Sequence, residues 1–282
     1  MLTTKSKIAL ARYVSRGVIA VRKLCRRPPG GCFQRKNLRW QLDLREGIDF
    51  SIFLLGAFEP SLLAFYQRRI KRGEIVLDIG ANIGAHTLHF ARAVAPDGRV
   101  VAIEATDYAF GKLQANLDLN PALKPYVRAH HALLADSAMA QKPAALPASW
   151  PLEGGQGLNA DHQGKLQSVG EARVLPLDDL VADERLEKVD WIKLDVDGNE
   201  LSVLRGAKSV LRGLRPRIFM ELAPSYYQND HFDELIAIIR DQGYHLYSIP
   251  ALRLLPSAPA GLKKMIPAGA SMNIMLDPKT EI

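Results

Sequence analysis

The sequence predicts an α/β protein in which a mainly parallel sheet is covered by helices on both faces. From residue 74 onward, short runs rich in β-branched residues alternate with segments of helical periodicity, which is the pattern of right-handed βαβ units. Four predicted core strands end in a carboxylate, namely Asp78, Glu104, Asp195 and Glu221. Because open α/β sheets bind ligands outside the carboxyl ends of their strands, these acids predict a site along one rim of the sheet.

The charge of the chain is divided between two regions. The formal net charge is +7, but residues 1–42 carry eleven Lys and Arg and no acid, which leaves 26 basic and 30 acidic residues in 43–282. We therefore interpret 1–42 as a basic N-terminal arm and linker, and 43–282 as a single, mildly acidic domain. A nucleic-acid partner is not expected, because that function normally requires a basic surface on the folded domain itself.

Residues 7–27 of the arm have apolar side chains at three-to-four spacing and a cationic face, as in an amphipathic helix. Peripheral contact with an anionic membrane and an organellar transit peptide are the two functional interpretations, and a helix packed on the domain is the structural one. No apolar stretch approaches the roughly 20 residues that a transmembrane helix needs. Cys25 and Cys32 lack a CxxC spacing and a second pair, so we predict no zinc site or disulfide framework, and a reducing, cytoplasmic location.

The segments before residue 74 are expected to form a linker, short strands and a helix. Residues 28–31 predict a linker, and residues 38–50 a short β meander. A helix is expected from Glu59 through Arg69, because the fixed φ of Pro60 and its missing N–H suit the first turn of a helix.

Residues 74–87 are the stretch around which we interpret the rest of the chain. They predict a strand to Asp78, a tight turn at Gly80 and a helix over 83–95. Segment 137–170 has prolines, glycines and little periodicity, so we expect a long loop or lid there. The other expected elements are strands at 99–104, 126–134, 172–176, 189–195 and 217–221, helices at 107–119, 177–186, 199–211 and 231–242, and final strands at 243–249 and 272–276 that form an antiparallel edge.

The turn discriminates between two cofactors that carry a ribose. Glu104 follows Gly84 by 20 residues, the spacing at which an acid meets a ribose hydroxyl in dinucleotide-binding units. Asn82, however, stands where the dinucleotide fingerprint needs the glycine that admits a pyrophosphate. S-adenosylmethionine (SAM) has a ribose and no pyrophosphate, so these residues favour SAM over NAD.

Two motifs in order resemble the FkbM-type family of SAM-dependent methyltransferases. They are Val76-Leu-Asp-Ile-Gly-Ala-Asn-Ile-Gly84 and Ile192-Lys-Leu-Asp-Val-Asp-Gly-Asn-Glu-Leu-Ser-Val-Leu-Arg-Gly206. The similarity also includes Gly56-Ala-Phe-Glu59-Pro60 and extends to residue 225. Two positions depart from the family pattern, since Ala105 stands where Pro is usual and Asp197 where Glu is commoner.

The resemblance implies a class I methyltransferase fold, which is Rossmann-like, and transfer of the SAM methyl group to a hydroxyl of a sugar, glycan or secondary metabolite. It also implies a cofactor site. Gly80, Ala81, Asn82 and Gly84 are expected to line the methionine end, with Glu104 at the ribose and Asp136 on the adenine side. Asp78 is expected to order the turn from behind.

Methyl transfer to an alcohol needs alignment and a proton acceptor. The sulfonium of SAM is a good leaving group, so the protein mainly aligns oxygen, methyl and sulfur. The hydroxyl proton calls for a carboxylate or His within hydrogen-bond reach. Asp195 is the first candidate, followed by Glu200 and Glu221, although Glu200 is equally explained as an acid in a helix's first turn. Alternative bases are His86, His130 and His131.

Residues 195–200 do not form an EF-hand, because Gly is fourth and Glu sixth where that loop has Gly sixth and Glu twelfth. We predict no metal, although a single Mg²⁺ on Asp195, Asp197 and Glu221 is left open. Two other functions also remain open. One is an NAD-dependent sugar oxidoreductase or epimerase, and the other is a membrane-surface protein with a degenerate Rossmann-like body.

Overall fold

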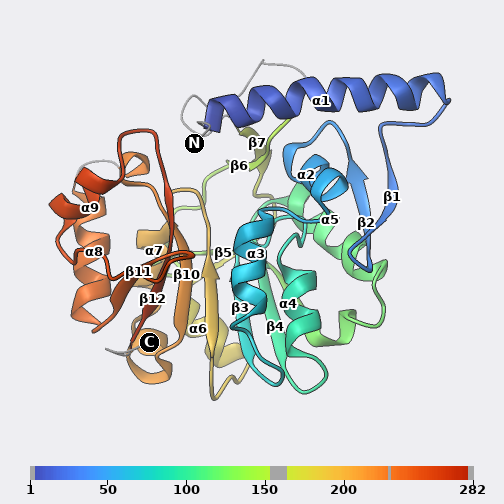
Figure 1. Ribbon diagram of the computed structural model, residues 1–282. Coiled ribbons are helices and arrows are strands. Elements are labelled where there is room, and N and C mark those ends of the chain that lie inside the picture. The colour runs from blue at the N-terminus through green and yellow to red at the C-terminus, as the bar shows by residue number, and fades with distance from the viewer. Residues whose placement is uncertain (1–3, 153–163, 228–229, 279–282) are drawn as a thin grey trace.

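Figure 1 shows the computed structural model of the chain, which describes residues 4–152, 164–227 and 230–278. An eight-stranded sheet forms its centre, with the strand order β11-β12-β10-β9-β3-β4-β5-β8. Its strands, in chain order, are β3 (Ile75–Ile79), β4 (Arg99–Glu104), β5 (Val127–Leu134), β8 (Arg173–Leu175), β9 (Trp191–Leu194), β10 (Arg217–Leu222), β11 (His245–Ser248) and β12 (Met272–Asp277).

Strand β3 lies inside the sheet and pairs in parallel with β4 on one side and β9 on the other. Parallel pairing continues from β4 through β5 to β8, and from β9 to β10. Strand β12 runs antiparallel to both of its neighbours, β10 and β11. The predicted mainly parallel sheet with an antiparallel C-terminal edge is therefore confirmed, and the ends of β3, β4, β9 and β10 meet at one rim.

Helices cover both faces of the sheet (Figure 1). Neighbouring residues of β3 show why, because side chains alternate between the faces of a strand. Val76 packs with aromatic residues of α3 and α4, whereas Leu77 packs with leucines of α6, α7 and α8. The helices are α1 (Thr4–Leu24), α2 (Gly47–Leu55), α3 (Pro60–Gln67), α4 (Thr87–Val94), α5 (Asp107–Asp118), α6 (Leu177–Asp183), α7 (Glu200–Arg205), α8 (His231–Asp241) and α9 (Pro259–Met265).

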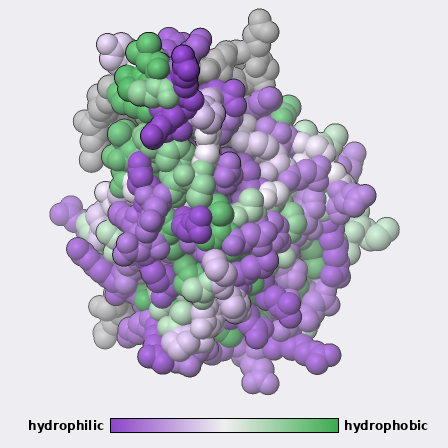
Figure 2. Space-filling model, turned by 90° about the vertical axis from the view of Figure 1, so that its right-hand side faces the viewer, coloured by the Kyte–Doolittle hydropathy of each residue, from purple (hydrophilic) through white to green (hydrophobic). Residues whose placement is uncertain are grey.

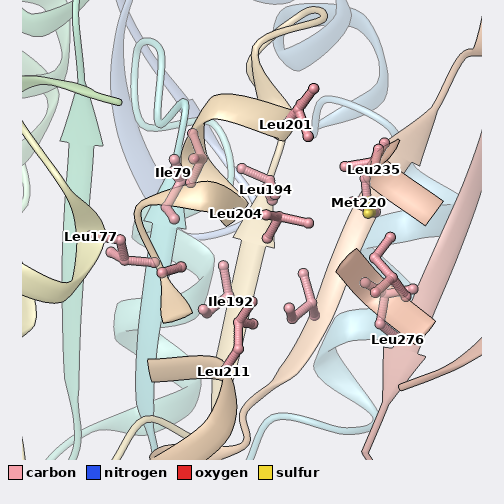
Figure 3. Packing of buried hydrophobic residues seen from close by; sticks show 14 of the residues in the cluster. Ile79, Leu177, Ile192, Leu194, Leu201, Leu204, Leu211, Met220, Leu235 and Leu276 are labelled. Carbon is pink, nitrogen blue, oxygen red and sulfur yellow. The ribbon is translucent and has the colours of Figure 1, made fainter. Parts of the chain in front are cut away.

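The larger core cluster lies between the sheet and helices α6, α7 and α8. Figure 3 shows part of it, where Leu194 of β9 and Met220 of β10 face Leu204 of α7 and Leu235 of α8. Ile192 and Leu194 of β9 belong to this cluster, so the alternation of side chains along the strand places Lys193 on the opposite face. The core therefore fixes the positions of the strand ends at the rim.

The N-terminal strands β1 (Gly30–Arg35) and β2 (Leu38–Asp43) form an antiparallel hairpin that packs on α5. The Asn120 side chain accepts a hydrogen bond from Arg39 N and donates one to Arg39 O, at 3.0 and 2.7 Å. Trp40 of β2 is fully buried. Residues 30–42 therefore belong to the folded body, which corrects the boundary expected at 42. The meander expected over 38–50 is wrong beyond Asp43, because α2 follows.

The segment expected to be a loop at 137–170 contains a second hairpin. Strands β6 (Ala145–Ser149) and β7 (Lys165–Ser168) pair antiparallel. Residues 153–163 of the expected loop lie outside the described residues. The sequence signal for this hairpin is weak because Pro147, which cannot donate to the ladder, lies inside β6.

Helix α7 is shorter than the predicted 199–211. It ends at Gly206, where an added Cβ would lie 2.2 Å from the carbonyl oxygen of Ala135. The chain resumes as one π-helical turn, Val210–Leu214. Helix α4 likewise begins at Thr87 rather than at 83, because the residues before it form the turn. Helix α9 was not predicted.

Helix α1 lies across the top of the body in Figure 1. Val14 and Val18 pack against the cluster that contains β2 and α2, and Ser15 Oγ donates a 2.8 Å hydrogen bond to Leu44 O. One face of the helix is thus bound to the domain. Among the described residues no single helix could cross a membrane; α2 and α3 pass that test of length and composition only together, and they are bent by 69°.

We predict that Asn120→Ala lowers the free energy of unfolding by roughly 1–3 kcal/mol, because Arg39 N and O lose their partner beside a buried side chain. Urea unfolding followed by circular dichroism measures the change. Asp118→Ala, at an exposed position of α5, serves as the matched control and is expected to change stability by less than about 0.5 kcal/mol. Equal effects of the two substitutions would show that the hairpin is not held by Asn120.

Candidate functional site

The rim is organised by a buried lysine at the end of β9. The Lys193 side chain is 4% exposed, and its Nζ lies 3.4 Å from Asp78 Oδ1 and 3.3 Å from Asp195 Oδ2. The ammonium also donates a 3.0 Å hydrogen bond to Gly80 O. Burial opposes the charge of Lys193, but Asp195 and Asp78 outweigh it and raise its pKa. Lys193 thus joins the ends of two neighbouring strands.

The turn after β3 leaves no room for larger residues at two positions. Gly80 has φ +74°, and a Cβ there would lie 1.8 Å from Asp195 O. Gly84 has φ +86°, and its Cβ would lie 2.9 Å from a methyl group of Leu113. Ala81, between them, is buried. Glycine is required at both positions because the turn is left-handed there and touches its neighbours.

Asp78 is fully buried and does not reach the surface of the rim. Its Oδ2 accepts a 2.6 Å hydrogen bond from Thr87 Oγ1, at the start of α4, while Oδ1 faces Lys193. Asp78 therefore connects β3 to the helix after the turn.

The carboxylate of Glu104, at the end of β4, accepts hydrogen bonds from the turn and from the residue two positions after it. Its Oε2 accepts a 2.9 Å hydrogen bond from Asn82 N, and its Oε1 accepts from Thr106 N and Oγ1 at 2.8 and 2.7 Å. Asn82 has φ +49°, a conformation that Asn tolerates better than most residues. A carboxylate offers about four acceptor positions, so one on Oε2 is left for a further donor.

The segment from β6 to residue 151 crosses the turn. Asn82 Nδ2 donates to Ala148 O at 3.3 Å, and Trp150 O accepts from Gly47 N at 2.9 Å. The segment therefore bridges the turn and the start of α2. It encloses a small pocket, which is lined by Glu46, Ile48, Asp49, Asn82, Ile83, Tyr108, Ala148, Ser149 and Trp150.

Three acids gather beyond Lys193, at the ends of β9 and β10. Asp195, Asp197 and Glu221 each place a carboxylate oxygen within 4.8 Å of the others. Burial and Asp195 raise the pKa of Glu221 to about 7, and burial with Asp195 and Glu221 raises that of Asp197 well above its usual value. The spacing would suit a divalent cation, but Lys193 already lies beside Asp195, and neighbouring acids alone do not make a metal site.

Glu200 is the first residue of α7, and its side chain turns back to the loop before the helix. It is 3% exposed, and its carboxylate accepts hydrogen bonds from Tyr227 Oη at 2.5 Å and from the backbone N–H groups of Val196 and Gly198 at 3.2 and 3.3 Å. Burial raises the pKa of Glu200 despite these donors. The structure favours the structural interpretation of Glu200, because its acceptor positions are directed into the chain.

Other predicted candidates contact residues outside the group of Asp195, Asp197 and Glu221. Asp136 is exposed after β5, where its N–H donates to Ser202 Oγ at 3.1 Å. His130 Nε2 lies 3.0 Å from Glu184, and His131 Nε2 lies 3.4 Å from Asp107. Both histidines belong to β5, and these pairings do not favour either as the base.

His86 is buried in a cage of rings. It is 4% exposed, it contacts the rings of Phe58, Tyr66 and Phe90, and neither ring nitrogen has a hydrogen-bond partner among the described residues. Burial and then Lys193 lower the pKa of His86 well below its usual value. The ring is therefore neutral.

Glu59, directly before α3, is a further acid of the rim that the sequence did not mark as a site residue. Its Oε2 lies 3.8 Å from His86 Nε2. Burial, Asp195 and Glu221 raise the pKa of Glu59 to about 7, so this carboxylate belongs to the acidic group at the rim. The signal in the sequence was the Glu-Pro pair in the family-like motif before α3, where an acid precedes the first helical residue.

The motifs at the rim fall within a match to a known protein family. A model of the methyltransferase FkbM domain matches residues 78–246. The chain belongs to the FkbM methyltransferase family. This confirms the family and the methyltransferase class predicted from the two motifs, and it supports SAM as the cofactor. The parallel sheet with its antiparallel C-terminal edge is the predicted class I methyltransferase architecture.

Several solved structures are similar to the chain at low identity. The methyltransferase FkbM of Methylobacillus flagellatus KT is 17% identical, with a TM-score of 0.45 over 74% of this chain and 44% of that one. A SAM-dependent O-methyltransferase of Thermotoga maritima is 14% identical, with a TM-score of 0.44 over 92% and 82%. Aeropyrum pernix fibrillarin, in complex with SAM, is 13% identical, with a TM-score of 0.43 over 88% and 82%.

The chain thus spans less than half the length of the Methylobacillus protein. TM-scores below 0.5 do not decide an activity, and the assignment to the family depends on the family model alone. No curated protein matches the chain.

We predict that Lys193→Met lowers the free energy of unfolding by roughly 3–5 kcal/mol, because Asp78 and Asp195 lose the cation between them. Denaturant unfolding measures the change. Lys188→Met removes an exposed lysine that pairs with Asp190 at 3.2 Å, and this control is expected to change stability by less than about 1 kcal/mol. A Lys193→Met protein as stable as the control would contradict the central role of this lysine.

Proposed function

We propose that the chain is a SAM-dependent O-methyltransferase that methylates a hydroxyl of a sugar, glycan or secondary metabolite. The observation that carries this proposal is the negative charge of the rim. Lys193 is matched by Asp78 and Asp195, and Asp197 and Glu221 add carboxylates beside it. SAM bears a sulfonium and an ammonium group, and such a rim attracts it, whereas it repels a pyrophosphate.

The cofactor would lie over the turn. Gly80, Ala81, Asn82 and Gly84 would line its methionine end, because the backbone can be approached closely there. The free acceptor position of Glu104 suits a ribose hydroxyl. Asp136 would lie on the adenine side.

The acceptor hydroxyl would enter at the acids beyond Lys193. When bound, SAM supplies an electrophilic methyl group on a good leaving group. Asp195 is partly exposed and held by Lys193, so it can position the hydroxyl. Glu221, with a pKa of about 7, can take the hydroxyl proton as the carbon–oxygen bond forms and the carbon–sulfur bond breaks, because a general base works best near the operating pH.

The NAD-dependent alternative is disfavoured by the same turn. A dinucleotide site needs free backbone N–H groups beside the pyrophosphate. Asn82 N is already bonded to Glu104, and the Asn82 side chain stands where the fingerprint has glycine.

The segment that crosses the turn at Ala148 fits the role of a lid over the cofactor.

We predict that S-adenosylhomocysteine binds in calorimetric titration and that NAD does not. Glu104→Ala is expected to weaken binding by roughly 1–3 kcal/mol, through loss of a hydrogen bond to the ribose and of the bond that orders Asn82. Glu171→Ala, at an exposed acid elsewhere, is the control and should bind like the native chain. Binding of NAD without S-adenosylhomocysteine would overturn the proposed function.

We also propose that α1 makes peripheral contact with an anionic membrane surface. Its outward face exposes Tyr13, Val21 and Leu24, at 80, 60 and 84%, between the exposed basic residues Arg16 and Lys23. Figure 2 shows hydrophobic surface beside hydrophilic surface at this end of the molecule. Apolar side chains among cations are typical of helices that lie in a lipid interface.

The triple substitution Tyr13→Ser, Val21→Ser and Leu24→Ser is expected to abolish co-sedimentation with phosphatidylserine vesicles while α1 stays packed, since these side chains face away from the domain. Leu254→Ser, which removes an exposed leucine after β11, is the control. If the triple variant and the control sediment alike, α1 is not the membrane contact.

A further inference from the structure

Glu59 is brought to the rim from a segment that precedes the whole sheet. It stands directly before α3, and its side chain is 38% exposed. Asp195 and Glu221 both act on its carboxylate electrostatically, and Asn273 of β12 is hydrogen-bonded to it. Glu59 therefore lies where α3 meets the ends of β9, β10 and β12.

The backbone at Glu59 is strained. Its φ and ψ are 44° and 65°, in the left-handed region, and the next residue is Pro60. A residue before proline is disfavoured in helical conformations, and a non-glycine residue with positive φ is rare. Such strain persists where the surroundings hold a side chain in a required position. Here it directs the carboxylate toward the rim.

His86 supplies an independent observation. Its ring is 4% exposed and neutral, both ring nitrogens lack a hydrogen-bond partner among the described residues, and Nε2 faces the Glu59 carboxylate from 3.8 Å. That distance is too long for a hydrogen bond. Buried polar atoms are normally satisfied, so the unpaired nitrogen and its neighbouring carboxylate point to a group that the described residues do not supply.

The charge of Glu59 is only partly compensated. Neutral His86 does not balance it, and the stabilising effect of Lys193 is smaller than the opposing effects of burial, Asp195 and Glu221. Asp195 differs, because its carboxylate already has Lys193 at 3.3 Å. A partly exposed carboxylate that forms no ion pair with Lys or Arg among the described residues suits a compact cationic donor.

We propose that Glu59 binds the α-ammonium of the methionine portion of SAM, with His86 behind it as a positioning residue. The proposal rests on the proposed function, which puts the methionine end of the cofactor at the turn from Gly80 to Gly84. The turn and Glu59 are joined through Asp195, whose carbonyl oxygen touches Gly80 and whose carboxylate neighbours Glu59. An ammonium group can donate to Glu59 and reduce the repulsion among these acids.

A thermodynamic cycle tests this contact. The native chain and Glu59→Gln are titrated with S-adenosylhomocysteine and with its analogue that lacks only the α-amino group. The native chain should prefer S-adenosylhomocysteine by roughly 10–100-fold, the range for a hydrogen bond to a charged group. In Glu59→Gln the two ligands should bind within about twofold of each other, because the variant keeps the shape of the side chain and removes its charge.

The analogue also controls for folding. If Glu59→Gln binds the analogue as the native chain does, the site is intact and the lost preference belongs to Glu59. An unchanged preference in the variant would overturn the proposal, and so would an equal loss of both ligands, because Glu59 would then act through the structure. Unchanged binding with lost turnover would likewise overturn it and make Glu59 a base. If the native chain binds neither ligand, the proposed function itself fails.

Discussion

The rim depends on one buried cation between two carboxylates. Lys193 extends from β9 to Asp78 at the end of β3 and to Asp195 at the end of β9, and it also holds the carbonyl of Gly80. Buried charges are tolerated only when they are paired and hydrogen-bonded. The close approach of the turn to Asp195, which only glycine permits, follows from this arrangement.

The acids of the rim divide into two groups by what binds them. Glu104 and Glu200 are held by donors of the chain, so they order the turn and the loop before α7. Among the described residues Glu59 and Glu221 form no ion pair with a lysine, and burial with neighbouring acids raises their pKa values to about 7 although Lys193 acts against this. The first group orders the backbone of the site. The negative charge of the second group favours cationic ligands, which matches a sulfonium cofactor better than a dinucleotide.

Two segments outside the sheet are held in place by hydrogen bonds to distant residues. The β1–β2 hairpin is fixed to α5 by Asn120, and the segment after β6 joins the turn at Asn82 to the start of α2. Strand β2 alternates buried and exposed side chains, whereas Pro147 interrupts β6. Their positions come from backbone hydrogen bonds to distant residues, which composition does not encode.

The alternation of strands and helices can be predicted from the sequence, and so can the turn from Gly80 to Gly84 and the family, because periodicity, glycine and motif spacing are local properties. The sequence also located the acids at the ends of four strands. The three-dimensional arrangement is needed to show which acids are held by several donors of the chain, as Glu200 is. It alone brought Glu59 and His86 together, since electrostatic surroundings and burial depend on contacts between segments far apart in the chain.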